Sequence, residues 1–317
     1  MAERETWGTS LRAGRDRLRA AGIESAEVEA ELLMRQALRT PNADLPTKAW
    51  LLPRLGQDAS DALRKTFDGL VARRLSHEPT AYITGLREFY ALDFEVTPDV
   101  LIPRPETELL ASRAVEWAYG SSPHPSPYPG LGDGTLRPMA QIKRTEHDPL
   151  RIVDVGTGSG AIAVALARQL PASTIIATDV SWDALAVARR NAQRHGVAAR
   201  ISFHHGDLLQ SLGCYVDLIV ANLPYIPATV LPGLAPEVRA HEPLLALAGG
   251  ADGLDLIRAL LHQAPRYLRP GGAICLEFGI GQSHALIEAL AHYFPSADSQ
   301  VFDDFAGLPR VLVTSLT

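Results

Sequence analysis

The chain has 317 residues, which is enough for one large domain and one small one. Its formal net charge of -6 and pI of about 5.9 argue against a dedicated nucleic-acid binder, because such proteins normally carry a basic excess. Its two cysteines, Cys214 and Cys275, lie far apart and form no CxxC pair, so free thiols in a reducing compartment are favoured over a disulfide framework.

The N-terminal stretch MAERETWGTS is polar and charged, unlike a secretory signal. No apolar run approaches the roughly 18 residues that are needed to cross a bilayer. His124 and His147 lie in a Pro- and Gly-rich segment without a closely spaced partner that would complete a metal site. We therefore expect a cytoplasmic protein with no membrane partner and no metal.

Residues 1–79 are predicted to form a small helical domain, because apolar residues recur there at helical spacing with charges between them. These residues are Leu63, Phe67, Leu70, Val71 and Leu75, with a second apolar face begun by Val28, Leu32 and Leu33. Residues 40–53 (TPNADLPTKAWLLP) contain three prolines and an Asn, which predicts a loop between helices. No chemical constellation is found here, so we expect a docking or positioning element.

Residues 80–103 change in character, because aromatic and β-branched residues alternate with polar ones, and this predicts a β-hairpin linker. A helix is predicted from Pro105, with acidic residues in its first turn, to about Tyr119. Residues 120–149 are rich in Pro, Gly, Ser and His, and we treat them as an insertion with no assigned role.

From residue 150 onward, strands and helices alternate, and residues 104–317 are therefore predicted to form a Rossmann-like α/β domain. Seven strands are expected, in a mainly parallel sheet with helices on both faces. No helix separates the final two strands, so the last strand should insert antiparallel to its neighbours.

A glycine-rich loop, DVGTGSGAIA, joins the first strand of this domain to its first helix. Gly156, Gly158 and Gly160 remove side chains that would block a ligand, and the helix N-terminus offers it free N–H groups. Asp179 ends the second strand, where a carboxylate can accept hydrogen bonds from two ribose hydroxyls. The same spacing satisfies the dinucleotide pattern, so S-adenosylmethionine, NAD or FAD, and a purely structural turn all remain open on the loop alone.

Two further acids favour S-adenosylmethionine among these alternatives. Asp154 lies two residues before the first glycine, where it can order the loop and meet the amino-acid end of the ligand. Asp207 follows the third strand, where an acid can read an adenine amino group. A turn or helix-cap role explains Asp207 equally well.

The second candidate feature is the tetrapeptide Asn222-Leu223-Pro224-Tyr225, directly after the fourth strand, at the sheet edge where open α/β sheets bind ligands. An amide or exocyclic amino nitrogen is a poor nucleophile, so it must be aimed at a methyl donor while its N–H groups are accepted. The side-chain carbonyl of Asn222 can accept one N–H, and the backbone carbonyl of Leu223 the other. Tyr225 can stack on the planar group. A proline turn with an N-capping Asn is the alternative, which the nearby glycine loop disfavours.

These motifs together resemble a known family. DVGTGSGAIA, ATD, NLPYI, LIPRPETE and EVRAHEPLLALAGGADGLD are similar to the HemK/PrmC family of protein glutamine N5-methyltransferases over nearly the whole chain. The resemblance implies a helical N-terminal domain, a hairpin linker and a catalytic domain that uses S-adenosylmethionine. It further implies methylation of the glutamine in the Gly-Gly-Gln motif of class I peptide chain release factors.

The resemblance also implies roles by position. The cofactor is implied to lie on Gly156, Thr157, Gly158, Ser159 and Gly160, with its ribose at Asp179, its adenine beside Asp207 and Leu208, and Asn222 close by. The glutamine amide is implied to be held by the catalytic residues Asn222, Leu223, Pro224 and Tyr225. Arg104 and Glu106 are implied to shape the wall beside the cofactor, although a salt-bridged helix start explains them as well.

One departure from the family pattern leaves alternatives open. The usual tetrapeptide is Asn-Pro-Pro-Tyr, and Asn-Leu-Pro-Tyr is also the form in ribosomal RNA adenine dimethyltransferases. The alternatives are a methyltransferase for a nucleic-acid base, one for a ribosomal protein glutamine, and an NAD-binding oxidoreductase. LIPRPETE, the helical domain and the acidic pI favour the release-factor enzyme. We expect a monomer with no direct nucleic-acid partner.

Overall fold

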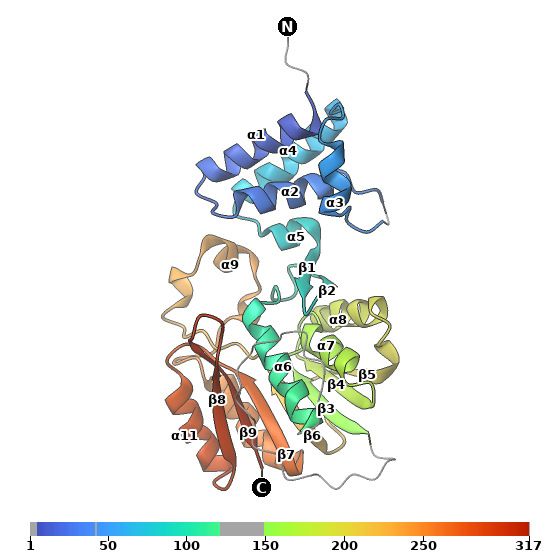
Figure 1. Ribbon diagram of the computed structural model, residues 1–317. Coiled ribbons are helices and arrows are strands. Elements are labelled where there is room, and N and C mark those ends of the chain that lie inside the picture. Colours follow the sequence, from blue (N-terminus) through green and yellow to red (C-terminus); the bar gives the residue numbers. More distant parts are fainter. Residues whose placement is uncertain (1–4, 42, 121–148, 317) are drawn as a thin grey trace. The chain divides into compact units, whose positions relative to one another are not determined.

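The computed structural model of the protein describes residues 5–41, 43–120 and 149–316 (Figure 1). Contacts divide the chain into two compact units, Met1–Leu86 with Ala235–His241 and Arg87–Leu234 with Glu242–Thr317. A short segment from the second half of the chain therefore belongs by its contacts to the N-terminal unit. The predicted insertion at 120–149 falls, except for its two end residues, outside the described ranges.

The N-terminal unit is helical, as its apolar periodicity predicts. Its elements are α1 (Trp7–Ala20), α2 (Ala26–Ala37), α3 (Lys48–Leu51), η1 (Leu52–Arg54), α4 (Asp61–Leu75), α5 (Thr80–Thr84) and α9 (Pro236–His241). The core contains Phe67, Val71 and Leu33, as predicted, but Val28 is 59% exposed, and α2 buries Ala30 in its place. The predicted loop at 40–53 contains α3, which begins where the Thr47 side chain accepts a hydrogen bond from the backbone of Trp50.

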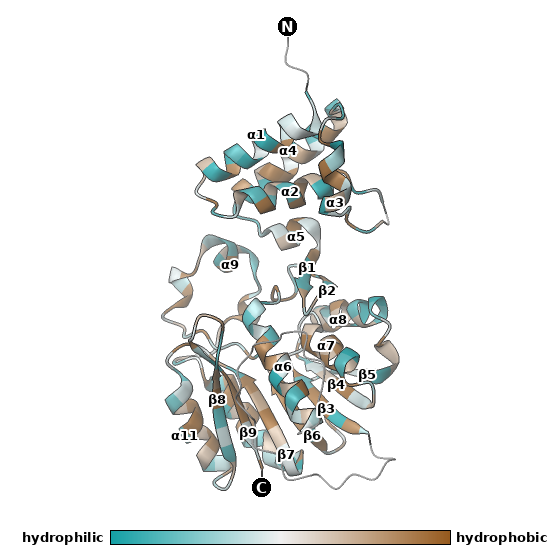
Figure 2. Cartoon of the chain, in the orientation of Figure 1, coloured by the Kyte–Doolittle hydropathy of each residue, from teal (hydrophilic) through white to brown (hydrophobic). Residues whose placement is uncertain are grey.

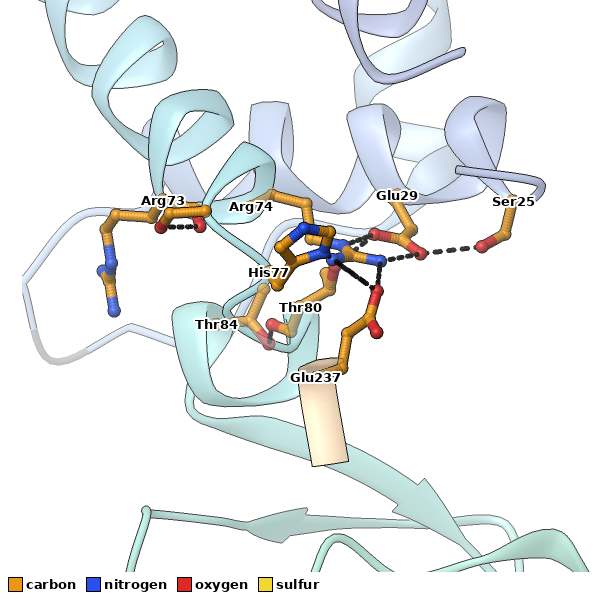
Figure 3. A network of polar contacts seen from close by, with 9 residues as sticks. Ser25, Glu29, Arg73, Arg74, His77, Thr80, Thr84 and Glu237 are labelled. Atoms are coloured by element: carbon orange, nitrogen blue, oxygen red, sulfur yellow. Dashed lines mark hydrogen bonds and ion pairs between the residues drawn. The ribbon is translucent and has the colours of Figure 1, made fainter. Parts of the chain in front are cut away.

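A polar network lies inside this unit, around the buried side chain of Arg74 on α4 (Figure 3). Its guanidinium pairs with Glu29 on α2 and donates to Glu237 on α9 at 3.2 Å. Thr80 on α5 donates to Glu29 at 2.6 Å, and Ser25 donates to the same carboxylate at 2.7 Å. Arg74 thus holds α9 against helices that precede it by more than 160 positions in the chain.

The charge of Glu29 is maintained by these donors. Burial by itself raises the pKa of the carboxyl group, but hydrogen bonds from Arg74, Thr80 and Ser25 outweigh it, so the pKa lies below its ordinary value. A carboxylate can only accept hydrogen bonds, so the donors around Glu29 fix its orientation. They hold this partly buried ion pair in one geometry.

The second unit is an α/β domain. After the hairpin strands β1 (Leu86–Phe89) and β2 (Leu92–Glu95), it contains the helices α6 (Pro105–Tyr119), α7 (Ala161–Gln169), α8 (Trp182–Arg194), α10 (Asp255–Gln263) and α11 (Ser283–Tyr293), with short 3₁₀ turns η2 (Ala198–Arg200), η3 (Leu231–Gly233), η4 (Leu244–Ala246) and η5 (Ala264–Arg266). The hairpin is shorter than the predicted linker 80–103, since Thr80–Thr84 is helical. Helix α6 begins at Pro105 with two glutamates in its first turn, where their negative charges interact favourably with the positive end of the helix dipole.

One seven-stranded sheet organises this unit, and the predicted Rossmann-like fold is confirmed (Figure 1). Its strands are β3 (Leu150–Val155), β4 (Ser173–Asp179), β5 (Ile201–His205), β6 (Val216–Ala221), β7 (Leu268–Glu277), β8 (Asp298–Asp303) and β9 (Pro309–Ser315). The order is β5-β4-β3-β6-β7-β9-β8. The last strand, β9, lies between β7 and β8 and is antiparallel to both, as predicted from the missing helix.

Helices cover both faces of this sheet (Figure 1). One apolar core joins the sheet to α6 and α7, and a second core joins the opposite face to α10 and α11. The central strands are accordingly apolar, whereas the edge strand β8 is largely polar (Figure 2). Among the described helices, none combines the length and apolar character that crossing a membrane requires.

We predict that Arg74→Met loosens the N-terminal unit, because it leaves the carboxylates of Glu29 and Glu237 without their shared cation. The expected loss is roughly 3–5 kcal/mol of local stability, the range for removing one partner of a buried ion pair. Hydrogen exchange of the α2 and α4 amides in the full chain should become correspondingly faster.

Arg73→Met is the matched control, because Arg73 lies one position away and its side chain is 47% exposed in its pair with Glu78, against 8% for Arg74. Exchange rates in α2 and α4 should stay close to those of the unmodified protein. Equal acceleration by both substitutions would contradict the role given to Arg74.

Candidate active site

The register of two neighbouring parallel strands sets the position of the site. Val155 at the end of β3 pairs with Ala221 at the end of β6. Gly156 and Asn222, the next residues, therefore leave the sheet side by side at its carboxyl edge, where open α/β sheets bind ligands. A cavity of about 490 Å³ lies at this edge.

The cavity wall comes from six segments of the α/β unit. They are residues 98–101, residues 103, 104 and 107 around the start of α6, residues 155–159, 161 and 162 of the glycine loop, residues 178–181 and 184 from the end of β4 onward, residues 206–208 after β5, and residues 222–224 after β6, with Pro243, Leu245, Ala246 and Leu256 completing the wall. Both sequence motifs, the glycine loop and the tetrapeptide, therefore face one space.

The three glycines of the loop all adopt positive φ angles, +72° at Gly156, +54° at Gly158 and +79° at Gly160. A Cβ on Gly158 would enter open space, whereas one on Gly160 would come within 3.0 Å of Ala188 on α8. The middle glycine thus leaves room in the cavity, and the last one permits close packing of the loop on a helix. The backbone carbonyl of Thr178 accepts the N–H groups of Gly156 and Thr157, which ties the loop to β4.

Asp154 orders this loop from below. It is fully buried, and one of its oxygens accepts hydrogen bonds from the Thr157 hydroxyl at 2.6 Å and from the Ala163 N–H at 3.1 Å. Its other oxygen has no hydrogen-bond partner among the described residues. Burial raises the pKa of Asp154 to about 7, in spite of these two donors.

Asp179 lies at the end of β4, in the cavity wall. Its carboxylate accepts the N–H of Gly158 and the N–H of Ser181, both at 2.9 Å. Burial raises its pKa, and these backbone hydrogen bonds act against the rise. Because each carboxylate oxygen can accept a second hydrogen bond, acceptor capacity remains toward the cavity.

Asp207 and Leu208 also line the cavity, after β5. The Asp207 carboxylate accepts a hydrogen bond from Gln210 at 3.1 Å, which is a turn-type contact. Leu208 has a φ of +53°, a conformation that a non-glycine residue seldom adopts, and its side chain is buried. The turn and the cavity wall are therefore built from the same two residues.

The side chains of the tetrapeptide point in different directions. Asn222 donates through Nδ2 to the Thr107 hydroxyl of α6 at 3.0 Å, which leaves its Oδ1 available. Leu223 is buried, and its Cδ2 would lie 3.1 Å from a Cβ on Gly156, so its side chain packs on the glycine loop. Tyr225 is not among the described residues that line the cavity, and its hydroxyl donates to Glu277 on β7 at 3.2 Å.

Two residues that the sequence interpretation missed hold the tetrapeptide from behind. The buried Glu277 has a pKa raised to about 7 by burial, and burial together with the Glu277 charge raises the pKa of Tyr225. Gln282 donates to the backbone carbonyl of Tyr225 at 2.9 Å and to that of Asp252 at 3.0 Å. Neither residue carries a local sequence signal, because each lies more than 50 positions from Tyr225.

The LIPRPETE motif contributes to the wall through one of the two residues expected, Arg104, and through Thr107, which was not expected. Arg104 lines the cavity and pairs with the buried Glu242, which also accepts the Ile102 N–H at 3.4 Å. Thr107 lines the cavity as well, whereas Glu106 is not among the described lining residues. The described residues hold no cluster of three or more His, Cys, Asp or Glu side chains that suits a metal ion.

Comparison with known proteins shows which family the chain belongs to. A family model described as the PrmC N-terminal domain matches residues 9–85, and one described as a methyltransferase domain matches residues 146–293. The release factor glutamine methyltransferase of Moorella thermoacetica is 40% identical over 311 residues, which cover 98% of this chain and 97% of that protein. The chain belongs to the release factor glutamine methyltransferase family.

A second member of this family, from Geobacter sulfurreducens, is 41% identical over 273 residues, which cover 84% of this chain and 81% of that protein. Among solved structures, the catalytic domain of hMettl16, in complex with MAT2A 3'UTR hairpin 6, matches with a TM-score of 0.51 at 16% identity, over 77% of this chain and 81% of that chain. At this identity the likeness concerns the fold alone.

We predict that Asp154→Asn changes how stability depends on pH. The raised pKa of Asp154 means that its stabilising contribution is fully present below its unfolded value of 3.8 and is lost as the pH rises through about 7. Between pH 5 and 8 the unmodified protein should lose about 2–3 kcal/mol relative to the variant, since each pH unit below the folded pKa is worth about 1.4 kcal/mol. Urea unfolding of both proteins at several pH values measures this difference, and parallel curves would contradict it.

Proposed function

We propose that the protein transfers a methyl group from S-adenosylmethionine to the side-chain nitrogen, N5, of the glutamine in the Gly-Gly-Gln motif of class I peptide chain release factors. The observation that carries this proposal is the orientation of Asn222. Its amide donates to Thr107, so its carbonyl oxygen is left for a substrate N–H, in the same cavity as the glycine loop. Membership of the release factor glutamine methyltransferase family supports the choice of substrate.

The cavity suits the proposed cofactor. A Cβ on Gly158 would meet no atom within 4 Å, so the loop from Gly156 to Gly160 offers bare backbone to a ligand, in front of the α7 N-terminus. We assign the ribose hydroxyls to Asp179 and the adenine to the wall at Asp207 and Leu208. When bound there, S-adenosylmethionine supplies a methyl group on a positively charged sulfur.

The chain's own residues then position the substrate amide. Asn222 Oδ1 accepts one N–H of the glutamine side chain, and the backbone carbonyl of Leu223 accepts the other. Pro224 restricts Leu223 to an extended conformation, which fixes the direction of that carbonyl. Tyr225, whose hydroxyl is held by Glu277, fixes the end of the tetrapeptide behind these two acceptors. Both acceptors favour the developing positive charge on nitrogen, so catalysis is mainly positioning and electrostatics.

We assign substrate docking to the N-terminal helical domain, residues 1–79, with residues 80–103 as the linker and 104–317 as the catalytic domain. Class I release factors act in the cytoplasm, so we place the enzyme there, as a monomer. Leu223 in place of proline leaves the proposed chemistry intact, because the role of this residue depends on its backbone carbonyl.

We predict that the purified protein transfers label from methyl-labelled S-adenosylmethionine to a class I release factor, at the Gly-Gly-Gln glutamine. A release factor with Gln→Ala at that position should receive no label, because it lacks the amide. Ribosomal RNA and ribosomal proteins, offered in competition, test the other substrates that the tetrapeptide allows. Label in either of these, and none in the release factor, would overturn the proposal.

Asn222→Ala is expected to lower turnover by about a hundredfold or more, the range for losing one preorganised polar contact at a reacting group. Cofactor affinity, measured by calorimetry, should change little, because the loop and Asp179 are untouched. Gln300→Ala is the control, since it removes an amide from the exposed edge strand β8. Near-normal turnover of Asn222→Ala would show that the amide is not held as proposed.

A further inference from the structure

A chain of buried polar groups runs behind the tetrapeptide and connects its two ends. Asn222 Nδ2 donates to Thr107 Oγ1 at 3.0 Å, and Tyr225 Oη donates to Glu277 Oε1 at 3.2 Å. Thr107 is 5% exposed and Glu277 is 1% exposed. The four side chains come from β7, from α6 and from the loop after β6.

In the middle of this chain, the Thr107 hydroxyl neighbours the Glu277 carboxyl and lowers its pKa, but the two groups do not form a full hydrogen bond. The Thr107 hydroxyl and the Tyr225 hydroxyl both act on the Glu277 carboxyl as donors, against the effect of its burial. Only the Tyr225 contact has full hydrogen-bond geometry, and Glu277 Oε2 has no hydrogen-bond partner among the described residues. A buried, unsatisfied carboxylate oxygen is costly, and the Thr107 hydroxyl is a neighbouring group that is able to donate to it.

The chemistry of the three groups sets the direction of every hydrogen bond in the chain. A carboxylate only accepts, so in a hydrogen bond between Thr107 and Glu277 the Thr107 hydroxyl is the donor. The Thr107 oxygen then acts as an acceptor toward Asn222, and Asn222 donates to it through its NH₂ group. Without Glu277, the threonine hydroxyl could equally donate to Asn222 and hold the amide turned over, with its NH₂ group toward the substrate.

We propose that Thr107 and Glu277 are positioning residues that keep the carbonyl oxygen of Asn222, rather than its NH₂ group, facing the cavity. The inference rests on the proposed function, because an acceptor is what a substrate N–H requires. An NH₂ group in that place would oppose the substrate N–H, donor against donor. Glu277 acts on Asn222 through Thr107 and fixes Tyr225 directly, so one carboxylate orients both ends of the tetrapeptide.

Burial raises the pKa of Glu277, so the pH decides whether it is in the ionised form that this role needs. Arg310 on β9 lowers its pKa and Glu106 on α6 raises it, and the pKa of about 7 leaves the group mostly ionised at about pH 8. Assays at that pH therefore test the carboxylate. Arg310 itself donates to Asp304 and to the Phe278 carbonyl, both at 3.3 Å, so it is held in place beside the strand end.

The first test compares Thr107→Val with Thr107→Ser. Valine has nearly the shape of threonine but no hydroxyl, so Asn222 loses its acceptor, and kcat should fall about tenfold or more, the effect of one buried hydrogen bond. Serine restores the hydroxyl and should keep kcat within about threefold of the unmodified enzyme. Cofactor affinity, measured by calorimetry, should be similar in both variants, so the loss should appear in kcat.

The second test is Glu277→Gln at about pH 8. A carboxylate offers one acceptor oxygen to Tyr225 and a second one to Thr107, whereas an amide places its NH₂ group, a donor, in one of these two positions. We expect kcat to fall about tenfold or more, with cofactor affinity retained. Thr314→Val is the control, because this buried β9 hydroxyl is shared with Ser299 at 2.9 Å and does not line the cavity. It should cost stability without lowering kcat.

The outcomes separate this inference from the proposed function. If the unmodified enzyme methylates the release factor and Thr107→Val is as active as Thr107→Ser, the positioning role is wrong and the function stands. Full activity of Glu277→Gln would likewise overturn it. A loss of kcat in Thr314→Val as large as that in Thr107→Val would show a general packing effect instead. No transfer by the unmodified enzyme would contradict the proposed function itself.

Discussion

The site depends on one pairing in the sheet, that of Val155 with Ala221 in neighbouring parallel strands. Strands that end in register release their next residues side by side, so the glycine loop and Asn222 enter the same space. Leu223 then packs against Gly156, where any larger residue would meet its side chain. The cavity is therefore bounded by the cofactor loop and the tetrapeptide because their strands end together, without a further element between them.

Two buried carboxyl groups beneath this edge of the sheet lower the stability of the folded protein. Asp154 and Glu277 are buried carboxyl groups, and each has one oxygen without a hydrogen-bond partner among the described residues. Burial raises the pKa of each to about 7, which is the sign of a charged form that the fold disfavours. One acid orders the glycine loop and the other acts on the tetrapeptide. The rule that buried polar groups are hydrogen-bonded is therefore broken at the places where the proposed reaction needs fixed geometry.

The sequence predicts those features that have a local signal. Pro105 with two following glutamates marked the start of α6, and two final strands without a helix between them gave the antiparallel β9. Helical spacing alone could not show which face of α2 is covered, so Val28 was misplaced. Thr107 and Glu277 were missed because their contacts span 115 and 52 positions in the chain. Contacts of that range depend on the sheet order, and no short motif records them.

The most direct test of the account is a crystal structure of the enzyme with S-adenosylhomocysteine and a Gly-Gly-Gln peptide. It should show the glutamine nitrogen donating to Asn222 Oδ1 and to the Leu223 carbonyl, with Asn222 Nδ2 still on Thr107. A glutamine side chain bound away from Asn222, or an Asn222 that turns its NH₂ group toward the substrate, would contradict the account.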